Sequence, residues 1–519
     1  METQRRPTSI LIHGGLVLTD PNGGPTATDI LIEADRIARV APHIPPGPKT
    51  KTIDARDRLV IPGLVNAHTH AHNNLARGSI DRLPLEIWVQ YLATRVANRT
   101  PRDIYVGAAI GAIEMARTGT TCACDMAQVT PWPTDEALDA VAQAYADVGL
   151  RASIAPQVFD LSFTESVAGL ERRLPRNVRA AIANRPPYPR DEVLVTLRRA
   201  ADRWHAFSSG RLRFGVGPNL ATLCSDEFLV ACSQLARERN LTLQTHLSET
   251  KTEAYTAWQR YGKRATEKLW DLGLLGPETV LAHSVWLNDH ELDLVAESRS
   301  TVAHNPVSNL KLGAGIAPVL KMRQRGINVA LGTDGSASND NQNMFGPLRL
   351  ASILHRVVDP NYDCWLGARD VLRMATENGA RAAGFEGQIG AIMPGRKADL
   401  VLLDLRTTYY HPRNDLVSQL VFAEVGSSVS MVMVDGRVIV EHGHMTTVDE
   451  AALLAEAAEI GQRVAVEMQA SLPLVERLEP YIRRAYLEAN RADSLINQYA
   501  SDAYRSLQAE KRAEENSTP

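Results

Sequence analysis

Twelve residues decide the fold of this chain: Leu59-Val60-Ile61-Pro62-Gly63-Leu64-Val65-Asn66-Ala67-His68-Thr69-His70. An apolar run that ends in polar residues is typical of a parallel strand buried on both faces, with its C-terminal tip at a site. Because successive side chains of a strand point to opposite faces, His68 and His70 point the same way. The pair can therefore bind one metal ion together.

Three later runs repeat this pattern, and their tips are His246, His283 and Asp334. A parallel barrel gathers the C-terminal tips of its strands at one mouth. Three imidazoles and one carboxylate can hold a single divalent metal and leave a position for water, whose pKa then falls to about 7. The set predicts a metal-dependent hydrolase.

Strand-like segments alternate with helical ones between these tips. Apolar residues recur at helical spacing over residues 85–96, 105–117 and 137–148, and short apolar runs follow at 122–126, 151–158, 212–218 and 300–304. This alternation favours βα units around a parallel sheet. We expect an α/β fold, a (β/α)8 TIM barrel over residues 63–386, with insertions after the first strand and at residues 164–189.

The two ends of the chain predict a second unit. Residues 9–18 and 29–40 flank the turn 20–24 as antiparallel strands, and residues 397–404 and 429–440 show the same character. We expect a small β-sandwich domain formed from residues 1–62 and 387–446. A helical extension should follow over residues 447–519, with an apolar side that packs across the barrel or against another subunit; that side holds Leu453, Leu454, Ala457, Ile460, Val464 and Met468.

Composition limits the partners. The 519 residues carry a net charge of −4 and no dense basic run, which argues against nucleic acid and anionic membrane surfaces. We see no apolar span of about 20 residues and no signal peptide. Five cysteines without zinc-finger pairs fit a reducing compartment. We expect a cytoplasmic protein with a small-molecule substrate, and a homo-oligomer of two or more subunits.

Several motifs together resemble the amidohydrolase superfamily. They are the run ending in His68-Thr69-His70, then His246-Leu247-Ser248-Glu249-Thr250, Asn305-Pro306-Val307-Ser308-Asn309, Leu331-Gly332-Thr333-Asp334-Gly335 and Pro394-Gly395-Arg396-Lys397-Ala398-Asp399. Within the superfamily they are most similar to the branch that holds cytosine-type deaminases, methylthioadenosine/S-adenosylhomocysteine deaminases and s-triazine hydrolases. The resemblance extends from residue 9 to about residue 445.

The resemblance implies roles for the shared residues. His68, His70, His246 and Asp334 would be the metal ligands, Glu249 the proton shuttle, and His283 the group that orients water or polarises the substrate. Superfamily members with two metals commonly bridge them with a carbamylated lysine, but no lysine lies between Lys51 and Lys251. We therefore expect one divalent metal per subunit, Zn²⁺ first and Fe²⁺ second, since imidazole suits both.

The substrate is less defined. At the position where the methylthioadenosine/S-adenosylhomocysteine deaminases carry a substrate-contacting histidine, this chain has Asn219, and residues 97–102 lack the acid of those enzymes. Trp88 can wall a pocket for a flat ring or pack within a helix. His304 and Asn305, at a strand tip, are further candidates for substrate contact.

Three functions stay open at this level. The first is hydrolysis of a C–N bond, by deamination or amine release, in a small N-heterocyclic or amide-like substrate. The second is a hydrolase that expels halide or thiolate, or cleaves a urea-type or carbamate-type carbonyl, because the same activated water can attack each of these electron-poor carbons. The third is a relative without enzymatic activity.

Overall fold

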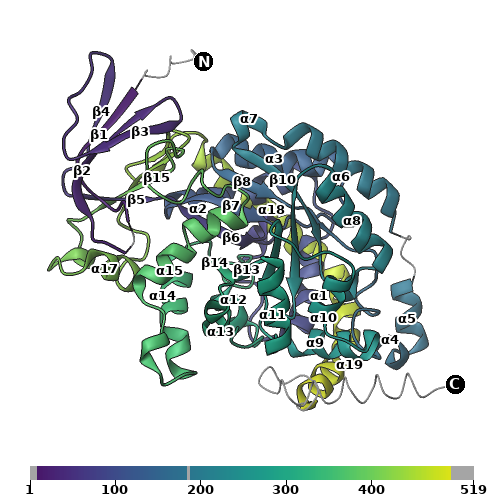
Figure 1. Cartoon of the computed structure of the whole chain (residues 1–519). Helices are drawn as coiled ribbons and strands as arrows, with labels where there is room; N and C mark the ends of the chain where they lie inside the picture. Colours follow the sequence, from purple (N-terminus) through teal and green to yellow (C-terminus); the bar gives the residue numbers. More distant parts are fainter. Residues whose placement is uncertain (1–8, 21, 184–187, 493–519) are drawn as a thin grey trace.

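The computed structural model describes residues 9–20, 22–183 and 188–492, and eight parallel strands in it form a nearly closed barrel (Figure 1). The strands are β6 (Leu64–Thr69), β7 (Thr120–Asp125), β8 (Arg151–Ile154), β10 (Leu212–Pro218), β11 (Thr242–Leu247), β12 (Thr279–His283), β13 (Thr301–His304) and β14 (Asn328–Leu331). They are paired in this order, and the short β9 (Gln157–Val158) pairs with β10. The strands are almost wholly buried, as their continuous apolar runs predict.

The barrel comes together where its first and last strands meet. The backbone N–H of Asp334 donates to the carbonyl of His68 at 2.9 Å. A Cβ at position 332 would lie only 2.9 Å from both the backbone N and O of His68, so this contact requires glycine. Gly332 therefore lets the strand that leads to Asp334 approach the strand that carries His68 and His70.

Helices cover the outside of the barrel (Figure 1). Those between β6 and β11 are α1 (Leu85–Val96), α2 (Pro101–Arg117), α3 (Asp135–Val148), α4 (Leu170–Arg173), α5 (Arg176–Ala183), α6 (Arg190–Trp204), α7 (Phe207–Gly210) and α8 (Asp226–Glu238). After β11 come α9 (Lys251–Tyr261), α10 (Ala265–Asp271), α11 (Asp289–Ser298), α12 (Pro306–Lys311), α13 (Val319–Gln324), α14 (Phe345–Leu354), α15 (Ala368–Met374) and α16 (Glu377–Ala382). Several begin at a side-chain cap, as α2 does at Thr100 and Asp103.

A separate mixed sheet is built from both ends of the chain. Its order is β18-β17-β16-β15-β5-β1-β2-β3, with β4 beside β1. The strands are β1 (Ser9–Val17), β2 (Thr26–Glu33), β3 (Arg36–Ala41), β4 (Thr50–Asp54), β5 (Arg58–Pro62), β15 (Leu400–Asp404), β16 (Val429–Val434), β17 (Arg437–Glu441) and β18 (His444–Met445). The helix α17 (Leu416–Phe422) lies between β15 and β16 in the chain. The predicted fold class, a barrel with a smaller β unit from both termini, is confirmed.

One predicted strand was wrong in its extent. Residues 29–40 belong to two antiparallel strands, β2 and β3, which pair across a turn. Ala34 in that turn has a φ of 54°. Alanine rarely adopts this left-handed conformation, so the alternating pattern of the segment concealed the turn.

Two helices follow the second sheet. The buried side of α18 (Glu450–Glu467) packs on α2, and α19 (Leu472–Arg491) packs on α1 and α9. Leu453, Ile460 and Val464 are buried, whereas Leu454 is 53% exposed and lies off the predicted apolar side. The predicted helical extension runs to residue 519, and residues 493–519 lie outside the described part. Among the described residues, no helix is long and apolar enough to cross a membrane.

A buried ion pair joins the barrel to the second sheet. Arg151, at the start of β8, donates to the two carboxylate oxygens of Asp399 at 2.8 and 3.0 Å and also to Asp435. Arg151 is 0% and Asp399 1% exposed. Its guanidinium also lies 4.9 Å from the centre of the Phe385 ring. Such a bidentate contact fixes geometry, and its loss leaves buried charges without partners.

We expect Arg151→Leu to lower the free energy of unfolding by about 3–5 kcal/mol, because the buried Asp399 carboxylate loses its cation while Asp435 keeps only Lys397 at 3.6 Å. Urea unfolding followed by circular dichroism measures this change. Arg406→Leu is the matched control, since Arg406 pairs with Asp404 at the exposed surface and should change the urea midpoint little. Equal midpoints for the Arg151 variant and the wild type would contradict the expectation.

Candidate metal centre

The predicted ligands come together at the mouth of the barrel. The donor atoms of His68, His70 and His246 all lie within 4.8 Å of one another, and so do those of His68, His283 and Asp334. Asp334 Oδ1 lies 3.3 Å from Nε2 of His70 and 3.8 Å from Nε2 of His68. The five side chains are at most about one-tenth exposed. The strand tips thus form one buried cluster of nitrogen and oxygen donors.

Two imidazoles of this cluster are held in a metal-binding tautomer. His70 Nδ1 donates to the carbonyl of Met126 at 2.8 Å, and His246 Nδ1 donates to the carbonyl of Asn219 at 3.0 Å. The Nε2 atoms of the two rings are then left facing each other at 3.3 Å. Two nitrogen lone pairs at this distance are held together favourably by a cation between them, either a proton or a metal ion.

The residues fit a divalent metal. Nitrogen ligands bound tetrahedrally at about 2.0–2.1 Å lie roughly 3.3 Å apart. His68 Nε2 points at the same cluster and has no hydrogen-bond partner among the described residues. A buried polar atom without a partner is uncommon and calls for an explanation such as a bound ion. A divalent metal gives these nitrogens a partner.

Burial and hydrogen bonds set the charges of the ligands. Burial, followed by the neighbouring histidines, lowers the pKa of His68 and His246, so the rings are neutral. Burial raises the pKa of Asp334, but His70, His283 and donors from Ser308 and Gly335 outweigh that effect and lower it. Ser308 Oγ donates to Asp334 Oδ2 at 2.5 Å. Neutral imidazoles and an ionised carboxylate are the forms that bind a metal.

The backbone at the strand tips is strained. His283 has a φ of 68°, Asp334 of 62° and Ser248 of 45°. A residue other than glycine in this region costs on the order of 1–3 kcal/mol, and such residues persist where surrounding structure holds them. The strain lies at the ends of β12 and β14 and directly before Glu249. It accompanies the turns that bring these side chains to the cluster.

Glu249 and His283 lie together beside the ligands. Glu249 Oε1 is 3.6 Å from His283 Nδ1, and His283 Nε2 is 4.0 Å from Asp334 Oδ2. Burial, then the negative charges of Asp334, Glu253 and Glu86, raises the pKa of Glu249 well above its ordinary value. A carboxyl group with a raised pKa can both take and give a proton near neutral pH.

Two side chains near the centre were missed by the sequence analysis. Asn309 Oδ1 accepts from His283 Nδ1 at 2.8 Å and so orients that ring. Glu86, in the first turn of α1, is 5% exposed and acts electrostatically on Glu249. Asn309 lies one helical turn beyond Asn305 in a quoted motif, which is a usable signal. Nothing in the spacing of Glu86 indicates its place.

The predicted substrate contacts have mixed surroundings. The Asn219 carbonyl holds His246, and the Asn305 Oδ1 atom is buried without a partner. His304 is fully buried, with its ring centre 5.8 Å from that of His355. Trp88 packs in an apolar cluster that includes Leu312 and Ala337, with its Nε1 unpaired among the described atoms. The structure therefore places Trp88 in helix packing but leaves a free donor on its ring.

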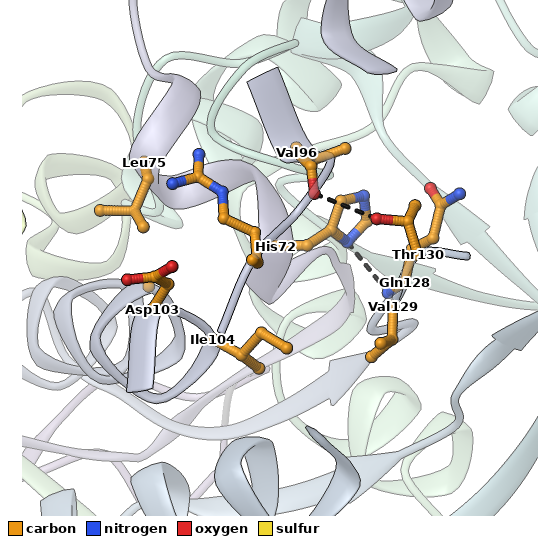
Figure 2. A pocket seen from close by; sticks show the side chains of 10 residues that line it. His72, Leu75, Val96, Asp103, Ile104, Gln128, Val129 and Thr130 are labelled. Atoms are coloured by element: carbon orange, nitrogen blue, oxygen red, sulfur yellow. Dashed lines mark hydrogen bonds between the residues drawn. The ribbon is translucent and has the colours of Figure 1, made fainter. Parts of the chain in front are cut away.

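His72 lies outside the ligand cluster. Figure 2 shows its Nδ1 accepting from the backbone N–H of Gln128, at 3.0 Å. The cavity that it lines with Leu75, Val96 and Ile104 has room for about 20 Å³, which is on the order of one water molecule. This cavity is too small for a ring substrate. Cys224 is also buried apart from the cluster, and its thiol lies 3.7 Å from the Val158 carbonyl.

Comparisons with known proteins agree with this centre. The model of the amidohydrolase family matches residues 59–439, which is more than half of the chain. The chain belongs to the amidohydrolase family. It is 38% identical to the 5'-deoxyadenosine deaminase of Methanothermobacter thermautotrophicus over 87% of this chain and 98% of that enzyme. It is also 36% identical to the 5-methylthioadenosine/S-adenosylhomocysteine deaminase of Thermococcus kodakarensis, over 83% and 94% of the two chains.

Solved structures show the same architecture. Atrazine chlorohydrolase TrzN from Arthrobacter aurescens, complexed with zinc, superposes with a TM-score of 0.80 at 28% identity, covering 87% of this chain and 100% of the other. An adenosine deaminase from Xanthomonas campestris with bound zinc gives a TM-score of 0.78 at 28% identity, covering 88% and 98%. This amidohydrolase is a metal-dependent hydrolase of carbon–nitrogen bonds that acts on a small molecule.

We expect His246→Ala to remove one tightly bound metal equivalent from this amidohydrolase. Removal of a partner outside the ligand shell already weakens metal binding about 10–100-fold, so removal of a ligand should weaken it more. Elemental analysis after dialysis against a weak chelator measures the loss. His72→Ala is the control and should keep its metal; equal metal in the His246 variant and the wild type would exclude His246 as a ligand.

Proposed function

We propose that this amidohydrolase is a deaminase that releases an amine from an amino-substituted aromatic N-heterocycle. One Zn²⁺ ion, or Fe²⁺ as the second choice, would be held by His68, His70, His246 and Asp334. Glu249 would carry the proton, and His283 would orient the water or polarise the substrate. The observation that carries the proposal is the pairing of Glu249 with His283 at 3.6 Å directly beside the ligand cluster.

The residues of this chain would transfer a proton from the attacking water to the leaving nitrogen. When bound, the metal supplies the Lewis acidity that makes hydroxide available from water at neutral pH. Glu249 accepts a proton from the water as its oxygen attacks the ring carbon that bears the amine. His283, whose Nδ1 donates to Asn309, can accept a hydrogen bond from the water at Nε2 and so orient it for attack. Glu249 then returns the proton to the departing nitrogen, the C–N bond breaks, and ammonia or an amine leaves.

The composition of the centre supports an aromatic substrate with polar ring atoms. Asn305 lies next to His283, and its Oδ1 atom is buried without a hydrogen-bond partner among the described residues. Buried groups of this kind can discriminate strongly between substrates, because a substrate that leaves them unpaired binds less well. The deaminase relatives, at 36–38% identity, act on adenosine derivatives according to their names.

A second function is favoured by a specific likeness. The zinc-bound atrazine chlorohydrolase resembles this chain over nearly its whole length, and that enzyme expels chloride. This chain also carries Asn219 where the methylthioadenosine/S-adenosylhomocysteine deaminases have a histidine. The alternative is therefore a hydrolase that expels halide or thiolate, or that cleaves a urea-type or carbamate-type carbonyl. The proton relay through Glu249 is the same in both.

A screen for the released group separates the two functions. Zinc-loaded protein is incubated with adenine nucleosides, free aminopurines, cytosine, pterins, chloro- and amino-triazines and ureas. Ammonia or amine release from an aromatic ring supports the proposal. Chloride release without amine release, across the same panel, supports the alternative and contradicts the deaminase.

We expect Glu249→Gln to keep the metal but to lower kcat by about 10²–10⁴-fold, the usual contribution of a general acid–base. The amide has nearly the same shape, but it cannot accept and return the proton. Steady-state kinetics and metal analysis on the same preparation measure the two effects. Glu136→Gln, at an exposed position of α3, is the control; full turnover in the Glu249 variant would remove it from this role.

We also propose a cellular location and an oligomeric state for this amidohydrolase. A cytoplasmic location and a homo-oligomer of two or more subunits were expected from the sequence and stay predictions. Size-exclusion chromatography with light scattering of the purified full chain tests the second.

A further inference from the structure

A second group of metal-binding side chains lies in the sheet built from the chain ends. His13 on β1, Asp29 on β2 and His43 after β3 place their donor atoms within 4.8 Å of one another. These strands belong to a different sheet from the eight strands of the barrel. The proposed deamination does not use any of the three residues. The question is whether the group is an ordinary ion pair or a binding site.

A β-bulge builds the group. Ile12 pairs with Ile30 and Gly15 pairs with Thr28, so His13 and Gly14 together face the single residue Asp29. Gly14 has a φ of 79°, a conformation that suits glycine. Bulges re-aim side chains relative to the regular pleat. Here the bulge turns both the His13 ring and the Gly14 N–H toward the Asp29 carboxylate.

Asp29 is a fixed and ionised oxygen donor. Its side chain is 2% exposed, and it accepts from the backbone N–H of Gly14 at 3.0 Å and of Ile44 at 2.9 Å. Burial acts to raise the pKa of Asp29, but these two N–H groups and His13 outweigh it and lower the pKa. Each carboxylate oxygen can accept more than one hydrogen bond or ligand bond. The carboxylate therefore keeps lone pairs for a cation.

The two histidines approach the Asp29 carboxylate from different segments, His13 from β1 and His43 from the segment after β3. His13 Nδ1 lies 3.0 and 3.1 Å from the two Asp29 oxygens, and His43 Nδ1 lies 3.8 Å from Oδ2. The 3.8 Å distance between His43 Nδ1 and Asp29 Oδ2 is too long for a hydrogen bond. The hydrogen bonds of His13 account for one ring beside the carboxylate, and His43 brings a second ring nitrogen within 4 Å of the same carboxylate. The side chains of His13 and His43 are 47% and 73% exposed, which leaves room for water ligands.

We propose that His13, Asp29 and His43 form a second divalent cation site, separate from the metal centre of the barrel. Two imidazoles and one carboxylate, completed by water, suit Zn²⁺ and neighbouring transition metals rather than Mg²⁺ or Ca²⁺, which prefer oxygen. The cation would join β1, β2 and the segment after β3. The site has no part in the reaction.

The site has a practical consequence for metal analysis. The barrel centre offers ligands for one metal, and its strands carry no bridging lysine. A preparation with two metal equivalents per chain would then hold one in the barrel and one in the sheet. Such a count is not evidence for a two-metal active centre.

Zinc binding by the full-length protein tests the proposal. Metal-free wild type and a His13→Ala/His43→Ala variant are dialysed against Zn²⁺ alone, and bound zinc is counted by elemental analysis. We expect the double variant to bind one equivalent fewer than the wild type, with kcat unchanged. Both histidines are partly or largely exposed, so their replacement should leave the fold intact, as circular dichroism can check.

Two further variants make the result specific. His444→Ala, which removes an exposed histidine from the same sheet, should bind as much zinc as the wild type. His246→Ala should lose the barrel equivalent and keep the second one. Equal zinc in the wild type and the double variant overturns the proposal without affecting the proposed deaminase. Loss of both equivalents in His246→Ala alone overturns it as well.

Discussion

The close approach of the Nε2 atoms of two histidines, His70 and His246, is the constraint on which the active centre depends. His70 and His246 come from opposite parts of the barrel, and each donates a hydrogen bond from Nδ1 to a backbone carbonyl. Their Nε2 atoms are then left 3.3 Å apart, which is the spacing of two nitrogen ligands on one metal ion. The fold therefore orients both rings for a cation before the cation binds.

The remaining structure maintains this arrangement. Because Gly332 has no Cβ, the segment after β14 can pack closely against β6, and Asp334 comes next to His68. Ser308 and Ser338 hold the Asp334 carboxylate, and Asn309 holds His283. These hydrogen bonds restrict the rotation of the Asp334 and His283 side chains. Glu249 is buried next to this cluster of charge, which raises its pKa and suits it to proton transfer.

Much of this organisation was predictable from the sequence. The strand tips can be recognised in the sequence because a parallel strand buried on both faces is apolar along its length. A polar residue at the end of such a run therefore marks the tip. His68, His70, His246 and Asp334 were found in this way, and so were most strand boundaries. The split of residues 29–40 was missed, since its turn uses Ala34 and lacks the glycine that usually marks such a conformation.

Other features depend on contacts that no local pattern encodes. Glu86 acts on Glu249 from a distant part of the sequence. Arg151 likewise pairs with Asp399 and Asp435, which lie 248 and 284 residues further along the chain. Leu454 has the right period for the apolar side of α18, but 53% of it is exposed. Long-range packing decides these positions, and the sequence around each residue is compatible with several outcomes.

The most direct test of the central claim is anomalous diffraction from crystals of the zinc-loaded protein, collected at the zinc absorption edge. The account predicts one strong peak among His68, His70, His246 and Asp334, with Glu249 beside it. A map with no peak between those side chains, in crystals whose zinc content is established, would contradict the account.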